Sequence, residues 1–106
     1  MAMSDEKIIE TLKETVRRIV PSDVKVYLFG SRARGDARED SDWDLLFLFE
    51  KEHVNADDFD TVVYPFFEVG SDTGAMISPV MYSRPQWEKT SFTPFHHHVM
   101  EEGVRL

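Results

Sequence analysis

The chain has 106 residues, a formal net charge of -8 at pH 7, and a composition that is 42% hydrophobic and 30% charged. This length and composition are typical of one globular domain, which we predict over residues 1–106. The acidic balance excludes a protein that coats nucleic acid through a basic face, and the absence of cysteine excludes disulfides and zinc–thiolate sites. No apolar run reaches the ~20 residues that span a bilayer, and residues 1–7 lack a signal-peptide pattern, so we expect a cytoplasmic protein without a membrane segment.

The first half of the chain reads as a helix followed by two strands. Ser4 is a favourable N-cap for an amphipathic helix that Pro21 ends. Residues 24–29 are rich in β-branched and aromatic side chains and predict a strand. A polar, basic turn with a short helix is expected over residues 31–41. The continuous apolar run in the next strand, residues 42–49, predicts burial on both faces of a sheet.

The middle of the chain predicts a second long helix and a third strand. Asn55 is a favourable N-cap, and a core-facing stripe comes after it at helical spacing: Phe59, Val62, Val63, Phe66 and Phe67. Pro65 falls inside this pattern and is expected to kink or split the helix. Residues 75–82 form the predicted strand, which Pro79 places at a sheet edge or at a bulge.

The C-terminal part predicts a capping box at Ser83 and Gln86 and a last helix over residues 94–102. The expected core side of that last segment consists of Phe92, Phe95 and Val99. The three consecutive histidines 96–98 fan out by about 100° each on a helix, so a solvated face with one partly buried ring is favoured over a metal site. The alternation of helices and strands predicts an α/β or α+β fold, a small sheet with helices packed on it.

Two aspartates one residue apart mark the start of the second strand. Side chains at i and i+2 of a strand point the same way, with Cα atoms roughly 6.5–7 Å apart. Asp42 and Asp44 can therefore converge on a shared divalent cation or on two. Magnesium prefers one or two carboxylates together with water and phosphate oxygens, so we predict both aspartates as metal ligands and catalytic residues. A cap or an ion-pair partner is the plainer alternative.

A glycine–serine turn precedes these carboxylates and suits a phosphate. Gly30 permits close approach of a ligand to the backbone, and the amides after it can form a concave anion site. Three arginines, Arg32, Arg34 and Arg38, raise the local positive potential in an acidic chain. Each feature alone is more often an ordinary turn or a solvated loop, but together they resemble the phosphate and metal sites used in phosphoryl-type transfer.

The stretch GSRARGDAREDSDWDLL, residues 30–46, resembles the signature of the minimal nucleotidyltransferases of the DNA polymerase β superfamily. The matching residues are Gly30, Ser31, Ala33, Arg34, Gly35, Ser41, Asp42, Asp44 and Leu45. The resemblance implies a small mixed β-sheet flanked by helices, with Mg²⁺ or Mn²⁺ at Asp42 and Asp44. It also implies a nucleoside triphosphate, with ATP expected, bound at Gly30, Ser31, Arg34 and Ser41. The implied reaction transfers a nucleoside monophosphate, with AMP expected, to a hydroxyl and releases pyrophosphate.

The resemblance further implies a partner, and one position departs from the family pattern. Small members often pair with a helical HEPN-domain protein, as antitoxins that adenylylate their partner, so a heteromer or a homodimer is expected. The family's third carboxylate is replaced here by Ser78, and no acid occurs between Asp72 and Glu88. Asp72 or Glu68, reaching in from the preceding turn or helix end, is one substitute for it. The alternative function is therefore a catalytically degenerate module that binds a partner protein.

Overall fold

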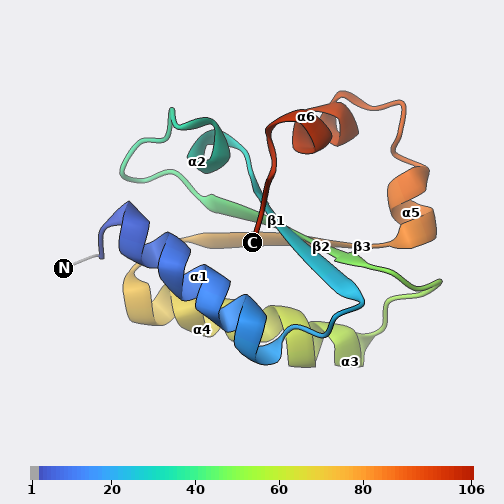
Figure 1. The fold of residues 1–106 in the computed structure, drawn as a ribbon, viewed down its shortest axis with the longest axis horizontal. Coiled ribbons are helices and arrows are strands. Elements are labelled where there is room, and N and C mark those ends of the chain that lie inside the picture. Colours follow the sequence, from blue (N-terminus) through green and yellow to red (C-terminus); the bar gives the residue numbers. More distant parts are fainter. Residues whose placement is uncertain (1–2) are drawn as a thin grey trace.

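The computed structural model describes residues 3–106 as a four-stranded sheet between two layers of helices (Figure 1). The elements are α1 (Asp5–Ile19), β1 (Val24–Phe29), α2 (Ser31–Arg34), β2 (Trp43–Phe49), α3 (Ala56–Asp58), the π-helical turn η1 (Phe59–Val63), α4 (Tyr64–Thr73), β3 (Ile77–Ser83), α5 (Arg84–Glu88), α6 (Pro94–Glu102) and β4 (Val104–Arg105). The strand order is β3-β2-β1-β4. Strand β1 is antiparallel to β2 and β4, whereas β2 and β3 are parallel. The predicted mixed sheet flanked by helices is confirmed.

Strand β2 is the centre of the core, because its side chains alternate between two apolar clusters. Leu45, Phe47 and Phe49 pack toward α1 and α4, where the Phe47 and Phe66 ring centroids lie 5.0 Å apart. Leu46 and Leu48 pack on the opposite face against α5 and α6. The predicted burial of this strand on both faces is confirmed. By the same alternation, Asp44 points to the face that carries α5 and α6.

Pro65 splits the second long helix, as predicted, and the split changes which side chains are buried. Pro65 lies in the first turn of α4, directly after η1. The i→i+5 hydrogen bonds of a π turn insert an extra residue and rotate the helical residues after it. Val62, Val63 and Phe66 are in the core, but the prediction for Phe67 is wrong, since it is 39% exposed. The prediction for Phe92 is also wrong, because it lies in a loop and is 96% exposed.

The sheet edges combine one predicted strand and one that the sequence did not reveal. Strand β3 lies at the edge, as Pro79 predicted, because a proline has no N–H to donate to a second neighbour. Strand β4 is only two residues long and pairs with Tyr27 and Leu28 of β1. Within residues 3–106, no helix has both the length and the apolar character needed to cross a bilayer.

Candidate active site

Gly30 and Asp44 are in direct contact where β1 ends and β2 begins. Gly30 has φ +76°, in the left-handed region that side chains disfavour, and it directly precedes α2. Its neighbour Phe29 is paired with Asp44 across the β1–β2 ladder. A Cβ atom at Gly30 would overlap the Oδ2 atom of Asp44. The glycine therefore allows the carboxylate to lie against the turn.

The two aspartates form a charge pair that the described protein groups do not neutralise. Burial raises the pKa of Asp44 above its ordinary value, and the neighbouring charge of Asp42 raises it further, while the charge of Arg34 opposes both. Among residues 3–106, neither carboxylate has an ion-pair partner, and Asp42 is exposed. A cation between them would offset this repulsion, so the pair suits a divalent metal.

The protein supplies two carboxylates to this site rather than three. Ser78 of β3 is paired with Asp44 in the parallel β2–β3 ladder, at the position where the third acid was expected. In the described chain, no group of three His, Cys, Asp or Glu side chains is placed to hold a metal. Glu68 and Asp72 are exposed on α4, which packs on the other face of the sheet, so the idea that one of them reaches in is wrong. Water and phosphate oxygens would complete the coordination of a magnesium ion.

Arg34 is near the carboxylates but is bound to other acids. Its Nε donates to Asp36 Oδ2 at 3.3 Å, and its Nη1 donates to Glu102 Oε2 of α6 at 3.4 Å. These two contacts raise the pKa of Arg34, and the hydrogen bond to Asp36 has the larger effect. The guanidinium is 43% exposed, so an incoming phosphate can reach it. Sequence reasoning missed Glu102, because nothing in the local pattern shows that α6 ends beside α2.

The two serines of the signature have different environments. Ser31 is the first residue of α2 and is partly buried beside Gly30, whose carbonyl accepts hydrogen bonds from Ala33 and Arg34. The Ser41 hydroxyl accepts a hydrogen bond of 2.8 Å from the Arg38 backbone N–H. In this structure Ser41 therefore orders the loop that leads into Asp42.

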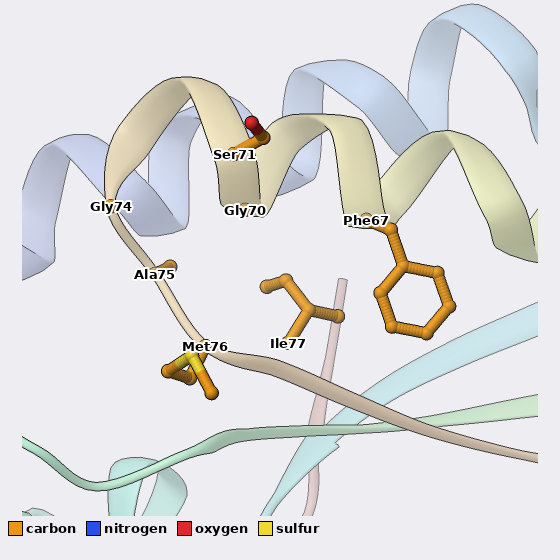
Figure 2. A pocket seen from close by; sticks show the side chains of 7 residues that line it. All are labelled: Phe67, Gly70, Ser71, Gly74, Ala75, Met76 and Ile77. Atoms are coloured by element: carbon orange, nitrogen blue, oxygen red, sulfur yellow. The ribbon is translucent and has the colours of Figure 1, made fainter.

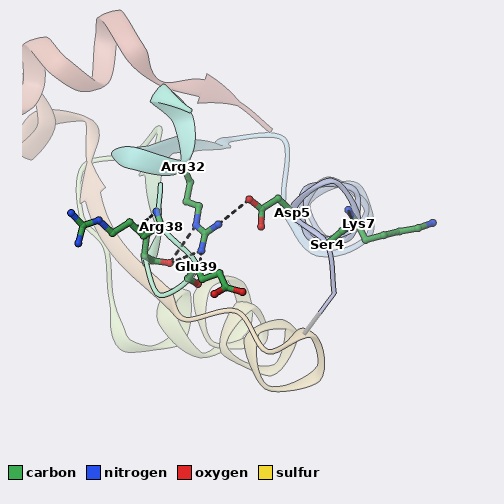
Figure 3. A network of polar contacts seen from close by, with 7 residues as sticks. Ser4, Asp5, Lys7, Arg32, Arg38 and Glu39 are labelled. Atoms are coloured by element: carbon green, nitrogen blue, oxygen red, sulfur yellow. Dashed lines mark hydrogen bonds and ion pairs between the residues drawn. The ribbon is translucent and has the colours of Figure 1, made fainter. Parts of the chain in front are cut away.

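Arg32 fixes the same loop through a network of polar contacts (Figure 3). Its guanidinium donates to the Ser41 carbonyl at 2.9 Å, to the Glu39 carbonyl at 3.1 Å and to Asp5 Oδ2 at 3.0 Å. It also lies 4.6 Å from the centre of the Trp43 ring, and its side chain is only 7% exposed. The Arg32 guanidinium is therefore occupied by internal partners rather than exposed to an incoming phosphate. Its partners are mostly backbone carbonyls, which no sequence motif records.

The three histidines do not form a site in this structure. The His96 ring is partly buried and lies 4.4 Å from the Trp87 ring. His97 pairs with Glu101 at 3.3 Å, and His98 is exposed. The favoured interpretation, a solvated helix face with one partly buried histidine, is confirmed.

Comparison with known proteins places this geometry in a family. The family model described as "Nucleotidyltransferase domain" matches residues 9–78, which include the Gly30 turn, both aspartates and Ser78. The chain belongs to the nucleotidyltransferase domain family. This confirms the resemblance found in residues 30–46.

This member of the nucleotidyltransferase domain family is similar to one curated protein in sequence and to solved structures in fold. It is 32% identical over 102 residues to a candidate protein adenylyltransferase of Methanocaldococcus jannaschii, covering 95% of this chain and 96% of that protein. A crystal structure of a toxin–antitoxin with AMP-PNP has a TM-score of 0.59 at 21% identity, over 97% of this chain and 72% of that one. A mutant of the toxin–antitoxin MntA–HpeT has a TM-score of 0.57 at 18% identity, over 97% and 71% of the two chains. At these identities the solved structures show a shared fold.

Proposed function

We propose that this protein transfers AMP from ATP to a hydroxyl group of a partner protein, using Mg²⁺ or Mn²⁺ held by Asp42 and Asp44. The observation that carries the proposal is the contact of Asp44 with Gly30, which puts a carboxylate pair with no ion-pair partner in the described residues beside the glycine–serine turn. Family membership and the similarity to a candidate protein adenylyltransferase support the reaction class. The AMP-PNP in a protein of the same fold supports the choice of adenine nucleotide.

The four residues predicted to bind the nucleotide each have a proposed role. Gly30 and Ser31 let the triphosphate approach the backbone, with Ser41 keeping the adjoining loop in place. Arg34 exchanges its contacts with Asp36 and Glu102 for a phosphate oxygen. Asp42 and Asp44 would hold a divalent cation, which would supply positive charge to offset the negative charge that develops during transfer. The acceptor oxygen bonds to the α-phosphorus as pyrophosphate leaves, and its proton passes to solvent because β3, which holds Ser78, carries no acid.

We further propose that the acceptor belongs to a small helical, HEPN-like partner, so that the working unit is a heteromer, with a homodimer as the alternative. The toxin–antitoxin assemblies among proteins of the same fold support a protein partner. A chain of 106 residues has little surface with which to enclose a bound nucleotide, which favours a site completed by a second subunit.

A second candidate function is supported by Ser78. Because Ser78 occupies the β3 position paired with Asp44, the site lacks the family's third carboxylate. A catalytically degenerate module would keep the fold and bind its partner without transferring a nucleotide. The two functions make different demands on Asp42 and Asp44, because nucleotide transfer requires both aspartates and partner binding alone does not.

The experiment that separates them uses ATP labelled at the α-phosphate, Mn²⁺ or Mg²⁺, and a candidate helical partner. Transfer of label by the wild-type protein, lost in Asp42→Asn and Asp44→Asn, is the expected result. Asp40→Asn is the matched control, because it removes an exposed carboxylate of the same loop that has no ion-pair partner in the described residues, and it should leave transfer within a few-fold. Tight partner binding with no label in any variant would support the binding module instead.

A further inference from the structure

The outer face of the helix over residues 56–73 carries exposed aromatic side chains among acids. We call it the acidic aromatic face and define it by Asp57, Asp60, Tyr64, Phe67, Glu68 and Asp72, all of which are exposed. Tyr64 and Phe67 are 52% and 39% exposed. Spacings of three and four residues along this set put its members on one side of a helix. Isolated apolar residues on a surface are ordinary, but grouped aromatic ones mark an interaction site.

The charge of this region has one sign. Residues 54–83 contain five acids and no Lys, Arg or His, and so contribute five negative charges to a chain whose net charge is -8. Asp58 is neutralised by Lys51, whose Nζ lies 2.6 Å from its Oδ1. Within residues 3–106, the four acids of the acidic aromatic face have no ion-pair partner. The face therefore presents uncompensated negative charge around an aromatic centre.

The aromatic rings of this face pack on one another, and Phe67 borders an apolar groove (Figure 2). The Tyr64 and Phe67 ring centroids lie 6.3 Å apart, and each is within 6.5 Å of the Phe59 ring. Beside Phe67, a groove of about 420 Å³ runs between α4 and the segment that enters β3, with Met76 and Ile77 on its far wall. Met76 is 67% exposed. The groove can receive apolar side chains without rearrangement of these rings.

We propose that this face and groove dock a basic amphipathic helix of a partner protein, with apolar side chains in the groove and Lys or Arg against the acids. A second copy of this chain would bring like charges together and is disfavoured. Nucleic acids and anionic membranes are disfavoured for the same reason. A helix with apolar residues on one side and cations beside them matches both the groove and the charge.

The acidic aromatic face lies on the opposite side of the sheet from Asp44, although the groove beside it reaches Met76, whose carbonyl accepts a hydrogen bond from Trp43, between the two aspartates. The helix over residues 56–73 packs on the sheet face that carries Phe47, whereas Asp44 points to the opposite face. The proposal rests on the proposed function only in expecting a partner protein. Docking needs neither metal nor nucleotide, so loss of nucleotide transfer and loss of docking can be told apart.

The test measures binding of a labelled 18-residue helical peptide, with Leu at i, i+3, i+4 and i+7 spacing and Lys elsewhere, by fluorescence anisotropy. A peptide with Glu for each Lys and a scrambled Lys peptide are the ligand controls. Tyr64→Ala and Phe67→Ala should each weaken binding about 5- to 30-fold. The double reversal of Glu68→Lys with Asp72→Lys should weaken it similarly, and more at low salt than at high salt. The matched reversal of Glu88→Lys with Glu101→Lys, on α5 and α6, should change it less than two-fold.

Several outcomes would overturn the proposal. These are absence of binding to the Lys peptide, equal binding of the scrambled peptide, or equal affinity of the wild type and the two alanine variants. If the reversal at Glu88 and Glu101 weakened peptide binding as much as the reversal at Glu68 and Asp72, the peptide would be attracted to the overall charge of the protein rather than to this face. A dimer in sedimentation that Tyr64→Ala dissociates, or binding to phosphatidylserine vesicles that Tyr64→Ala abolishes, would assign the face to another occupant. The variants' thermal melts must match the wild type, which the exposure of the altered side chains leads us to expect.

Discussion

Ser78 lies beside Asp44 in the parallel ladder between β3 and β2, where a third carboxylate would complete a metal site. Side chains of residues paired in this way extend from the same face of the sheet. An acid introduced at position 78 would therefore lie beside Asp44, next to the proposed metal ligands. This relationship lets the missing group be restored by a single substitution.

We predict that Ser78→Asp tightens Mn²⁺ binding about ten-fold, equivalent to about 1.4 kcal/mol, because a third carboxylate joins the first two. If the protein transfers nucleotides, the rate should rise as well. Titration of Mn²⁺ followed by electron paramagnetic resonance measures the affinity. Ser78→Asn is the control, since it has a similar size without the charge. An affinity that is equal in the Asp and Asn variants would show that position 78 does not face the metal.

Asp44→Asn should raise the stability of the metal-free protein while removing metal binding. The folded state raises the pKa of Asp44, so its contribution to stability is complete below the ordinary value of 3.8 and is lost as the pH rises through the folded-state pKa. The gain at pH 7 should be at most about 1 kcal/mol, because solvent screens this partly exposed group. Urea unfolding of both proteins between pH 3 and pH 8 measures it. If Asp44→Asn left the pH dependence of the unfolding free energy unchanged, the pKa of Asp44 would not be raised in the folded state.

Gly30→Ala should destabilise the protein far more than Gly35→Ala. Both glycines have positive φ, +76° and +86°, so both substitutions carry a backbone penalty of about 1–2 kcal/mol. At Gly30 the new methyl group also overlaps Asp44, whereas Gly35 has open space around it. We expect a total loss of about 3 kcal/mol or more at Gly30, and thermal melts give the comparison. Equal losses at the two sites would mean that Asp44 does not rest on Gly30.

Arg32→Met should lower the free energy of unfolding by about 2–3 kcal/mol, because it leaves the Ser41 and Glu39 carbonyls without their charged donor. Asp5→Asn breaks only the exposed ion pair and should cost about 0–1 kcal/mol. Arg32→Met should also weaken Mn²⁺ binding several-fold, since the loop it fixes ends at Asp42. Metal titration under conditions where both variants are folded checks this. Unchanged affinity in Arg32→Met would show that Asp42 is held by other contacts.

Glu102→Gln should strengthen ATP binding about two- to five-fold. The substitution removes one of the two carboxylates that hold Arg34, so a phosphate competes with one acid instead of two. Calorimetric titration with a non-hydrolysable ATP analogue measures the change. Glu101→Gln, one residue earlier on α6, is the control. Equal affinity of the two variants for the ATP analogue would show that Glu102 does not keep Arg34 from binding phosphate.

Sequence reasoning predicted the elements well because periodicity, caps and prolines are local signals. Pro65 split a helix and Pro79 marked the edge strand, as the missing N–H requires. Sequence patterns did not predict contacts that depend on the packing of segments distant in the chain. The contacts of Arg32 with the Glu39 and Ser41 carbonyls, and of Glu102 with Arg34, depend on how segments meet in three dimensions. The π turn before α4 exposed Phe67 because it shifted the helical register that the prediction had assumed.

The proposed transfer depends on Asp42 and Asp44 together binding one divalent cation beside the Gly30 turn. Its most direct test is a crystal of the protein grown with Mn²⁺ and a non-hydrolysable ATP analogue, with anomalous scattering used to locate the metal. We expect an anomalous peak within about 2.0–2.6 Å of an oxygen from each carboxylate, with the triphosphate bridging from the peak to the turn. Nucleotide bound elsewhere, or a peak that touches neither aspartate, would contradict it.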